Sequence, residues 1–142
     1  MASYVLIGLG GALGSLLRAW VAMAMARLTG PEFPWGTILI NIAGSFLIGF
    51  VAALTATDGR TQGLAELRTF LMVGFCGGFT TFSSFSLQTF DLIRSGAWPR
   101  AIINVVLSVV LCIAAVAVGH SLAHRSVALA AIAETAEEEF TG

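Results

Sequence analysis

Small polar residues recur at helical spacing within two of the most apolar stretches of the chain. The two stripes are Thr37, Asn41 and Ser45, and Asn104, Ser108 and Cys112. Residues four positions apart share one face of a helix. Inside a bilayer, such groups either bond neighbouring helices or line a polar path. Two complete stripes in so short a chain favour a path for a small ion.

Residues 74–86, GFCGGFTTFSSFS, combine glycine, threonine, serine and phenylalanine. Gly77 and Gly78, followed by Thr80 and Thr81, bring together residue types that weaken a helix. A break at this point would free backbone carbonyls for a cation, and the next half-helix would start with its positive end. The alternative is a straight helix whose glycines allow close packing.

An aromatic stripe runs through the same segment, with serines between the rings. Its members are Phe75, Phe79, Phe82 and Phe85, with Ser83 and Ser84 interleaved. Aromatic rings have a positive edge, which can stabilise a small anion without a cation to trap it. Packing is the ordinary role of such a stripe, but the serines favour a polar surrounding.

The charged residues exclude several classes of protein. Only 11% of the 142 residues are charged, 57% are hydrophobic, and mean hydropathy is +0.91, which argues against a water-soluble enzyme. The chain has no lysine, and its net charge of -1 offers no basic surface for nucleic acid. Arg18 would either extend to the interface or form an electropositive vestibule for anions. No predicted span carries a central carboxylate, which argues against a proton-coupled cation exporter.

Charges divide the chain into four apolar runs that can cross a bilayer as helices. We predict transmembrane helices at about 3–26, 34–57, 68–92 and 99–124. Residues 1–125 would form one membrane domain and residues 126–142 an acidic tail, either helical or disordered. Pairs of glycines spaced i, i+4 in the first and third helices predict close helix contacts. They are Gly10 with Gly14, and Gly74 with Gly78.

The arginines flanking the predicted helices do not select an orientation. Three lie on each side: Arg60, Arg68 and Arg125 on one, Arg27, Arg94 and Arg100 on the other. Because excess positive charge normally marks the cytoplasmic side, a balanced chain can insert both ways. Two opposite orientations can form an antiparallel dimer. Four short helices enclose little space, so a pore would require that second subunit.

These motifs together resemble the CrcB/Fluc family of fluoride channels. The likeness is carried by GGALGSLLR at 10–18, WGTILIN at 35–41 with Gly44, and GGFTTFSSF at 77–85. The resemblance implies a dual-topology homodimer with two pores. It also implies a structural Na⁺ at the dimer centre, held by the backbone carbonyls of Gly77 and Thr80 from each subunit. Asn104 and Cys112 stand where some members have Tyr and Ser.

The resemblance further implies roles for side chains along a fluoride path. Asn41 would donate to fluoride, Phe82 and Phe85 would present ring edges, and Ser83 and Ser84 would lie beside them. Ser108 would belong to a polar track on the fourth helix, and Arg18 to the aqueous vestibule. We therefore expect a non-enzymatic channel in the bacterial inner membrane that passively exports fluoride. The alternative is a small dual-topology exporter of another ion or small molecule.

Overall fold

The computed structural model describes residues 1–55 and 62–141, with backbone alone for 62–63 and 130–141. All regular structure in these ranges is helical. The elements are α1 (Ala2–Thr29), α2 (Trp35–Leu54), α3 (Gln62–Arg68), the π-helix η1 (Thr69–Cys76), α4 (Gly77–Phe79), α5 (Phe82–Arg94) and α6 (Trp98–Thr141).

Four helical stretches are long and apolar enough to span a membrane, which confirms the predicted number. They are Ala2–Thr29, Trp35–Leu54, Leu64–Arg94 and Trp98–Leu129. The second was expected to reach residue 57, but α2 ends at Leu54, and residues 56 and 57 lie outside the described ranges. The last helix continues through the acidic tail to Thr141, so the helical alternative for that segment is the one found.

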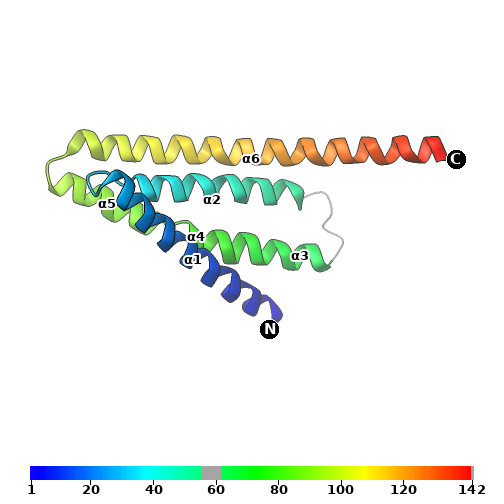
Figure 1. The fold of residues 1–142 in the computed structure, drawn as a ribbon, viewed down its shortest axis with the longest axis horizontal. Coiled ribbons are helices and arrows are strands. Elements are labelled where there is room, and N and C mark those ends of the chain that lie inside the picture. The colour runs from blue at the N-terminus through cyan, green and yellow to red at the C-terminus, as the bar shows by residue number, and fades with distance from the viewer. Residues whose placement is uncertain (56–61, 142) are drawn as a thin grey trace.

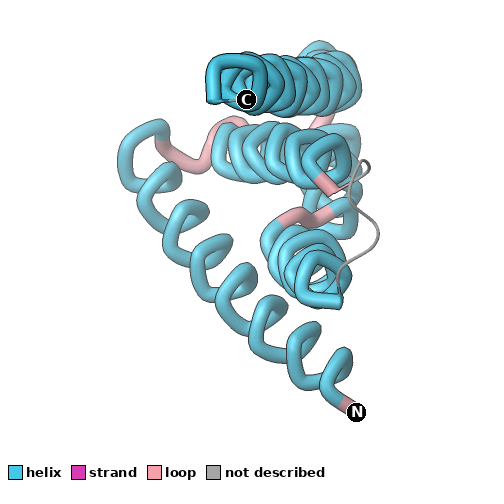
Figure 2. The backbone as a smooth tube through the Cα atoms, turned by 90° about the vertical axis from the view of Figure 1, so that its right-hand side faces the viewer, coloured by secondary structure: helices cyan, strands magenta, loops and turns pink. Residues whose placement is uncertain are grey.

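Successive spans run in opposite directions, as short connections require. In Figure 1, α2 and α6 run side by side in the same direction, while α1 and the segment from α3 to α5 run the other way. Figure 2 shows α2 between α6 and the α3–α5 segment, with α1 inclined beside them, and Figure 1 shows α1 crossing that segment obliquely. Gly30 and Gly96, with φ of 75° and 76°, make the left-handed turns after α1 and α5.

Glycines let α1 approach η1 and α4 backbone to backbone. A Cβ atom on Gly10 would lie 2.9 Å from the Phe75 amide nitrogen, and one on Gly78 would lie 2.9 Å from Gly11 Cα. Side chains at these positions would hold the helices apart. The predicted close contact of the glycine pairs is therefore confirmed. Gly49 serves the same purpose between α2 and α6, where its Cβ would lie 3.0 Å from Val116 Cα.

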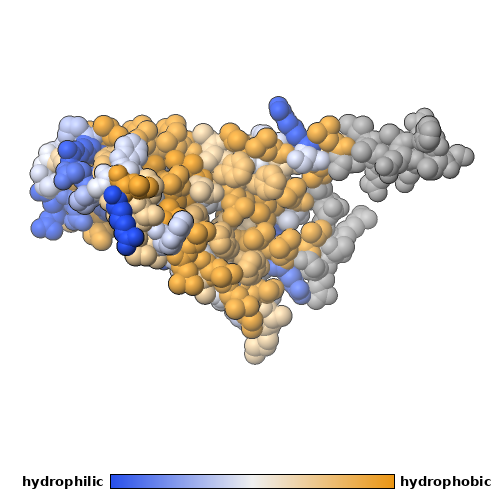
Figure 3. Space-filling view, in the orientation of Figure 1, coloured by the Kyte–Doolittle hydropathy of each residue, from blue (hydrophilic) through white to orange (hydrophobic). Residues whose placement is uncertain are grey.

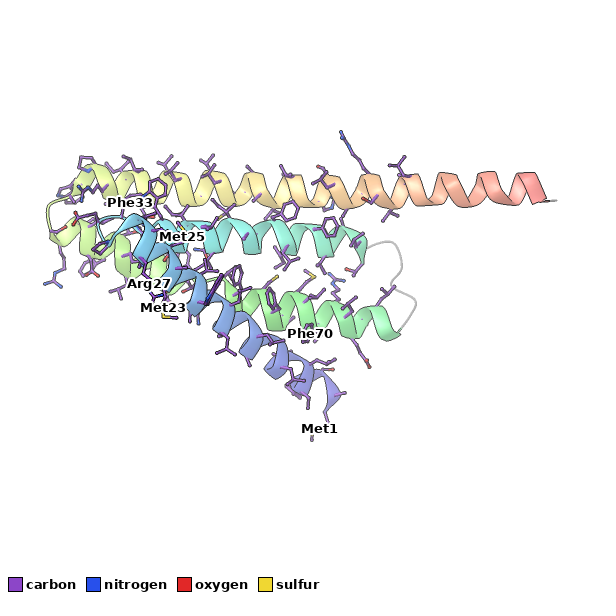
Figure 4. All side chains as sticks on the ribbon, in the orientation of Figure 1. Met1, Met23, Met25, Arg27, Phe33 and Phe70 are labelled. Atoms are coloured by element: carbon purple, nitrogen blue, oxygen red, sulfur yellow. The ribbon has the colours of Figure 1, made fainter. Side chains whose placement is uncertain are left out.

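Apolar side chains cover most of the outer surface. The face drawn in Figure 3 is hydrophobic along the helices and hydrophilic mainly at one end. Figure 4 shows Arg27 and Phe33 near that end, where α1 leads into α2. Among the described residues, the largest fully buried side chains are those of Ile40, Asn104 and Cys76. A chain that buries so little and exposes so much apolar surface requires lipid or a second subunit around it.

Candidate functional site: a polar cleft at a helix break

The third span breaks at two extended threonines. Thr80 has φ −77° and ψ 158°, and Thr81 has φ −152° and ψ 104°, between the end of α4 and the start of α5. Gly77 and Gly78 themselves stay helical. The break therefore lies just after the glycine pair, and Gly78 serves the contact with α1. The π-helix η1 leads into the break, a feature that the sequence pattern did not indicate.

Hydrogen bonds from two sides hold the extended residues. The backbone N–H and the hydroxyl of Thr80 both donate to the Cys76 carbonyl, each at 2.9 Å. The Thr81 N–H donates to Asn41 Oδ1 at 2.8 Å, and Asn41 Nδ2 donates to the Thr81 carbonyl at 3.2 Å. In an unbroken helix, the Thr81 N–H would donate to the Gly77 carbonyl. The break therefore deprives the Gly77 carbonyl of its usual donor.

Thr81 also caps α5. The Ser84 backbone N–H donates to Thr81 Oγ1 at 3.1 Å, and Thr81 Oγ1 donates to Ser84 Oγ at 2.9 Å. Ser83 Oγ lies 3.3 Å from the same hydroxyl. A side-chain oxygen at this position satisfies one of the free N–H groups of a helix start. Ser83 and Ser84 thus surround the cap of α5.

A cleft of about 480 Å³ lies beside the break, between α2, η1, α4, α5 and α6. Its polar side chains are Asn41, Ser45, Thr80 and Ser108, and its aromatic side chains are Phe82 and Phe85. Gly77 and Cys112 also line it, with aliphatic residues around them. The cleft brings together parts of both polar stripes and the second half of the aromatic stripe.

Six of the expected site residues line this cleft, and three do not. The six are Asn41, Gly77, Thr80, Phe82, Phe85 and Ser108. Ser83 and Ser84 lie at the α5 cap, and Arg18 on α1 is half-buried away from the cleft. Sequence periodicity could not separate these groups, because it does not show which helices meet.

The aromatic stripe divides at the break. Phe82 and Phe85 reach the cleft with ring centroids 5.4 Å apart and planes tilted by 49°. Phe75 and Phe79, before the break, stack at 5.7 Å and 19° outside it, and Phe79 is buried. Two extended residues between the pairs send the rings to different surroundings.

The stripe on α6 is partly structural. Asn104 is 1% exposed, and its Nδ2 donates to Thr89 Oγ1 at 2.8 Å. Ser108 Oγ donates to Asn104 Oδ1 at 3.5 Å, which links the cleft to this buried pair. Sequence reasoning did not single out Thr89, although it lies on α5, eight residues after the capping Thr81.

Gln88 is a second residue that the sequence pattern did not indicate. Its Oε1 atom is buried without a hydrogen-bond partner within the described residues. The side chain borders hollows near the α1–α2 connection, where Arg100 and Glu32 form an exposed ion pair at 3.0 Å.

Within the described ranges, no group of three or more His, Cys, Asp or Glu residues could hold a metal ion.

Comparisons with known proteins agree with this architecture. Residues 5–120 match the family model described as CrcB-like protein, Camphor Resistance (CrcB). A protein of Paramagnetospirillum magneticum named fluoride-specific ion channel FluC is 54% identical over 120 residues, which cover 84% of this chain and 94% of the relative.

Two further relatives bear the same name and align over more of this chain. The protein of Gluconobacter oxydans is 53% identical over 137 residues, and that of Methylobacterium radiotolerans is 50% identical over 136 residues. Each alignment covers 95% of this chain and 94% of the relative. A family match over most of its length and four membrane-spanning helices identify this chain as a multi-pass membrane protein of the CrcB family.

Proposed function

We propose that the chain is a fluoride-selective channel that lets cytoplasmic fluoride leave the cell passively, driven by its concentration gradient and the membrane voltage. The observation that carries the proposal is identity of 50–54% with relatives named fluoride-specific ion channels, over 84–95% of this chain and 94% of each relative. The polar and aromatic cleft supplies groups suited to this function. Such a channel would confer fluoride resistance, and because it moves the ion without making or breaking a covalent bond, it would not be an enzyme.

Groups on the cleft wall would replace the water that fluoride gives up. Asn41 Nδ2 carries two hydrogens and uses one for Thr81, so the other has no acceptor among the described residues and can bond an anion. The ring edges of Phe82 and Phe85 offer weaker stabilisation, and the Ser108 hydroxyl extends the path along α6. Ser83 and Ser84 would act from the α5 cap, and Arg18 at an aqueous vestibule. Several weak sites in series permit selectivity without trapping the ion.

The working channel would be an antiparallel homodimer in the bacterial inner membrane. In one protomer the cleft is open and carries polar groups at membrane depth, which hydrocarbon would not satisfy. A second copy would cover it. The arginines at the two ends of the helices are balanced in number, which permits insertion in both directions. One of these residues, Arg60, lies outside the described ranges.

A Na⁺ ion at the dimer centre would be held by the Gly77 and Thr80 carbonyls. These groups fit the ion, because carbonyl oxygens are ligands for hard cations. The Gly77 carbonyl has lost its usual helical donor to Asn41, and a Cβ on Gly77 would meet no atom of the described residues within 4 Å. Both residues line the cleft, so the same carbonyls from an inverted copy could complete the site. When bound, the ion would supply a positive charge that attracts the carbonyls at the helix breaks of both subunits.

The test is ion release from liposomes that contain the purified protein and a fluoride gradient. A fluoride electrode should record rapid release, and the same vesicles should retain chloride.

Asn41→Asp and Phe82→Ile should abolish most of the fluoride release. Phe90→Ile is the matched control, since Phe90 lies on the same helix, is 56% exposed and does not line the cleft. Fluoride release from the wild type without selectivity over chloride would contradict the proposal. Unaltered flux in Phe82→Ile would remove that residue from the path.

A further inference from the structure

The Asn41 side chain pairs with both polar groups of the Thr81 backbone. Oδ1 accepts from the Thr81 N–H at 2.8 Å, and Nδ2 donates to the Thr81 carbonyl at 3.2 Å. An extended residue presents its N–H and C=O on the same edge, as in an antiparallel sheet. The carboxamide of Asn41 therefore takes the place of a neighbouring strand. Asn and Gln alone carry a neutral donor and acceptor side by side on one side-chain group.

This pairing satisfies the backbone N–H and C=O of Thr81, for which bulk water is not a ready partner. Thr81 is 6% exposed, so bulk water does not reach it freely. An unsatisfied backbone group at membrane depth is costly, because hydrocarbon offers it no hydrogen-bond partner. If Asn41 were removed, the Thr81 N–H would be driven back toward the Gly77 carbonyl, its ordinary helical acceptor. The side chain on α2 thus stabilises the broken form of the third span over the straight one.

We propose that Asn41 is a positioning residue that holds the helix break open, in addition to any bond that it makes to fluoride. The inference rests on the proposed function. By fixing Thr81, Asn41 fixes the cap of α5 and hence the first turn that carries Phe82 and Phe85. By occupying the Thr81 N–H, it leaves the Gly77 carbonyl available to a cation. One side chain therefore couples the anion path to the cation site.

The first experiment measures the pairing directly by NMR of ¹⁵N-threonine-labelled protein in bicelles. In the wild type, the Thr81 amide should be a slowly exchanging, hydrogen-bonded proton. Asn41→Leu, similar in size but unable to bond, should move this proton upfield and speed its exchange by about tenfold, as expected for loss of one hydrogen bond. The Thr80 amide is an internal control, because its acceptor is the Cys76 carbonyl and not Asn41.

The second readout is the Na⁺ concentration that half-maximally stabilises the dimer against heat. Asn41→Leu should raise this concentration by about tenfold, the same factor expected for the Thr81 amide, because the hydrogen bond that holds Thr81 also keeps the Gly77 carbonyl available to the ion. Leu39→Ala is the control on the same helix, since Leu39 is 44% exposed and does not line the cleft, and it should leave both the Na⁺ response and the Thr81 signal unchanged. A merely structural weakening would lower stability at every Na⁺ concentration without changing the half-maximal value.

The outcomes separate the two proposals. Loss of fluoride flux in Asn41→Leu with an unchanged Thr81 signal and Na⁺ response would overturn the positioning role and leave Asn41 as an anion donor only. Should Asn41→Leu fail to fold, a rapidly exchanging Thr81 amide in the wild type would overturn it equally. Absence of fluoride flux in the wild type would refute the channel, while faster Thr81 exchange in Asn41→Leu would still establish the pairing.

Discussion

The contact between α1 and the helices before the break should be sensitive to a single methyl group. A Cβ on Gly10 would lie 2.5 Å from the Phe70 carbonyl oxygen and 2.9 Å from the Phe75 amide nitrogen. Carbon and oxygen atoms in close contact are about 3.3–3.6 Å apart, so Gly10→Ala must separate the two backbones by about 1 Å. Neither neighbour is a flexible side chain that could move aside.

A matched variant isolates the cost of this separation. A Cβ on Gly8, in the same helix, would meet nothing within 4 Å in the part of the chain that the structure describes. Both substitutions gain the helix propensity of alanine, worth up to about 1 kcal/mol, so their difference measures packing alone. Overpacking a tight contact costs about 1–3 kcal/mol. We therefore expect Gly10→Ala to be less stable than Gly8→Ala by about 1–3 kcal/mol.

The assay is SDS-induced unfolding in mixed micelles, followed by far-ultraviolet circular dichroism and by tryptophan fluorescence. Both variants are compared with the wild type at equal protein concentration, because dimerisation would shift the midpoint. Fluoride release from liposomes should fall in Gly10→Ala and persist in Gly8→Ala, since η1 and α4 position the break. Equal stability of the two variants would refute the close backbone approach of α1 to η1.

The remaining predictions concern polar contacts. A double-mutant cycle with Asn104→Ala and Thr89→Val should give a coupling of about 0.6 kcal/mol in SDS unfolding, and strictly additive effects would contradict the bond between them. Thr81→Val removes the α5 cap and should lower stability by about 1 kcal/mol and reduce flux, whereas a stable, fully conducting variant would argue against the cap. Glu32→Gln should change stability by less than about 1 kcal/mol, because the ion pair with Arg100 is exposed; a larger loss that persists in high salt would show otherwise.

Local properties explain why much of the fold was predictable. The length of a stretch and its lack of charge determine whether it can span a bilayer, and both properties are read directly along the chain. The region of the break was predictable because helix propensity is also a local property of each residue. The residues that indicated it are Gly77, Gly78, Thr80 and Thr81. The exact position of the break could not be predicted from propensity. Gly77 and Gly78 remain helical, and Thr80 and Thr81 become extended. Propensity alone does not decide which neighbouring backbone groups find other partners.

Residue roles that depend on contacts between helices were harder to predict. The assignment of Ser83 and Ser84 to the ion path stays a prediction, and the contact that the structure gives Ser84, a hydrogen bond to the α5 cap, was not indicated by the pattern. Gln88, with its buried unpartnered oxygen, gave no signal in the pattern at all. A periodic stripe identifies a shared helix face, but it does not say whether that face meets another helix, a cleft or lipid.

The sequence by itself determined a membrane protein of four helices, with a weakened third span and polar stripes on the second and fourth. Hydropathy, length and propensity are properties of local segments, so no contact was needed to infer them. The tertiary structure decided that Asn41 meets Thr81, 40 positions away, and that Phe82 and Phe85 share a cleft with Ser108. Those contacts depend on how each helix is rotated and how closely the glycines allow its neighbours to approach, which only packing determines.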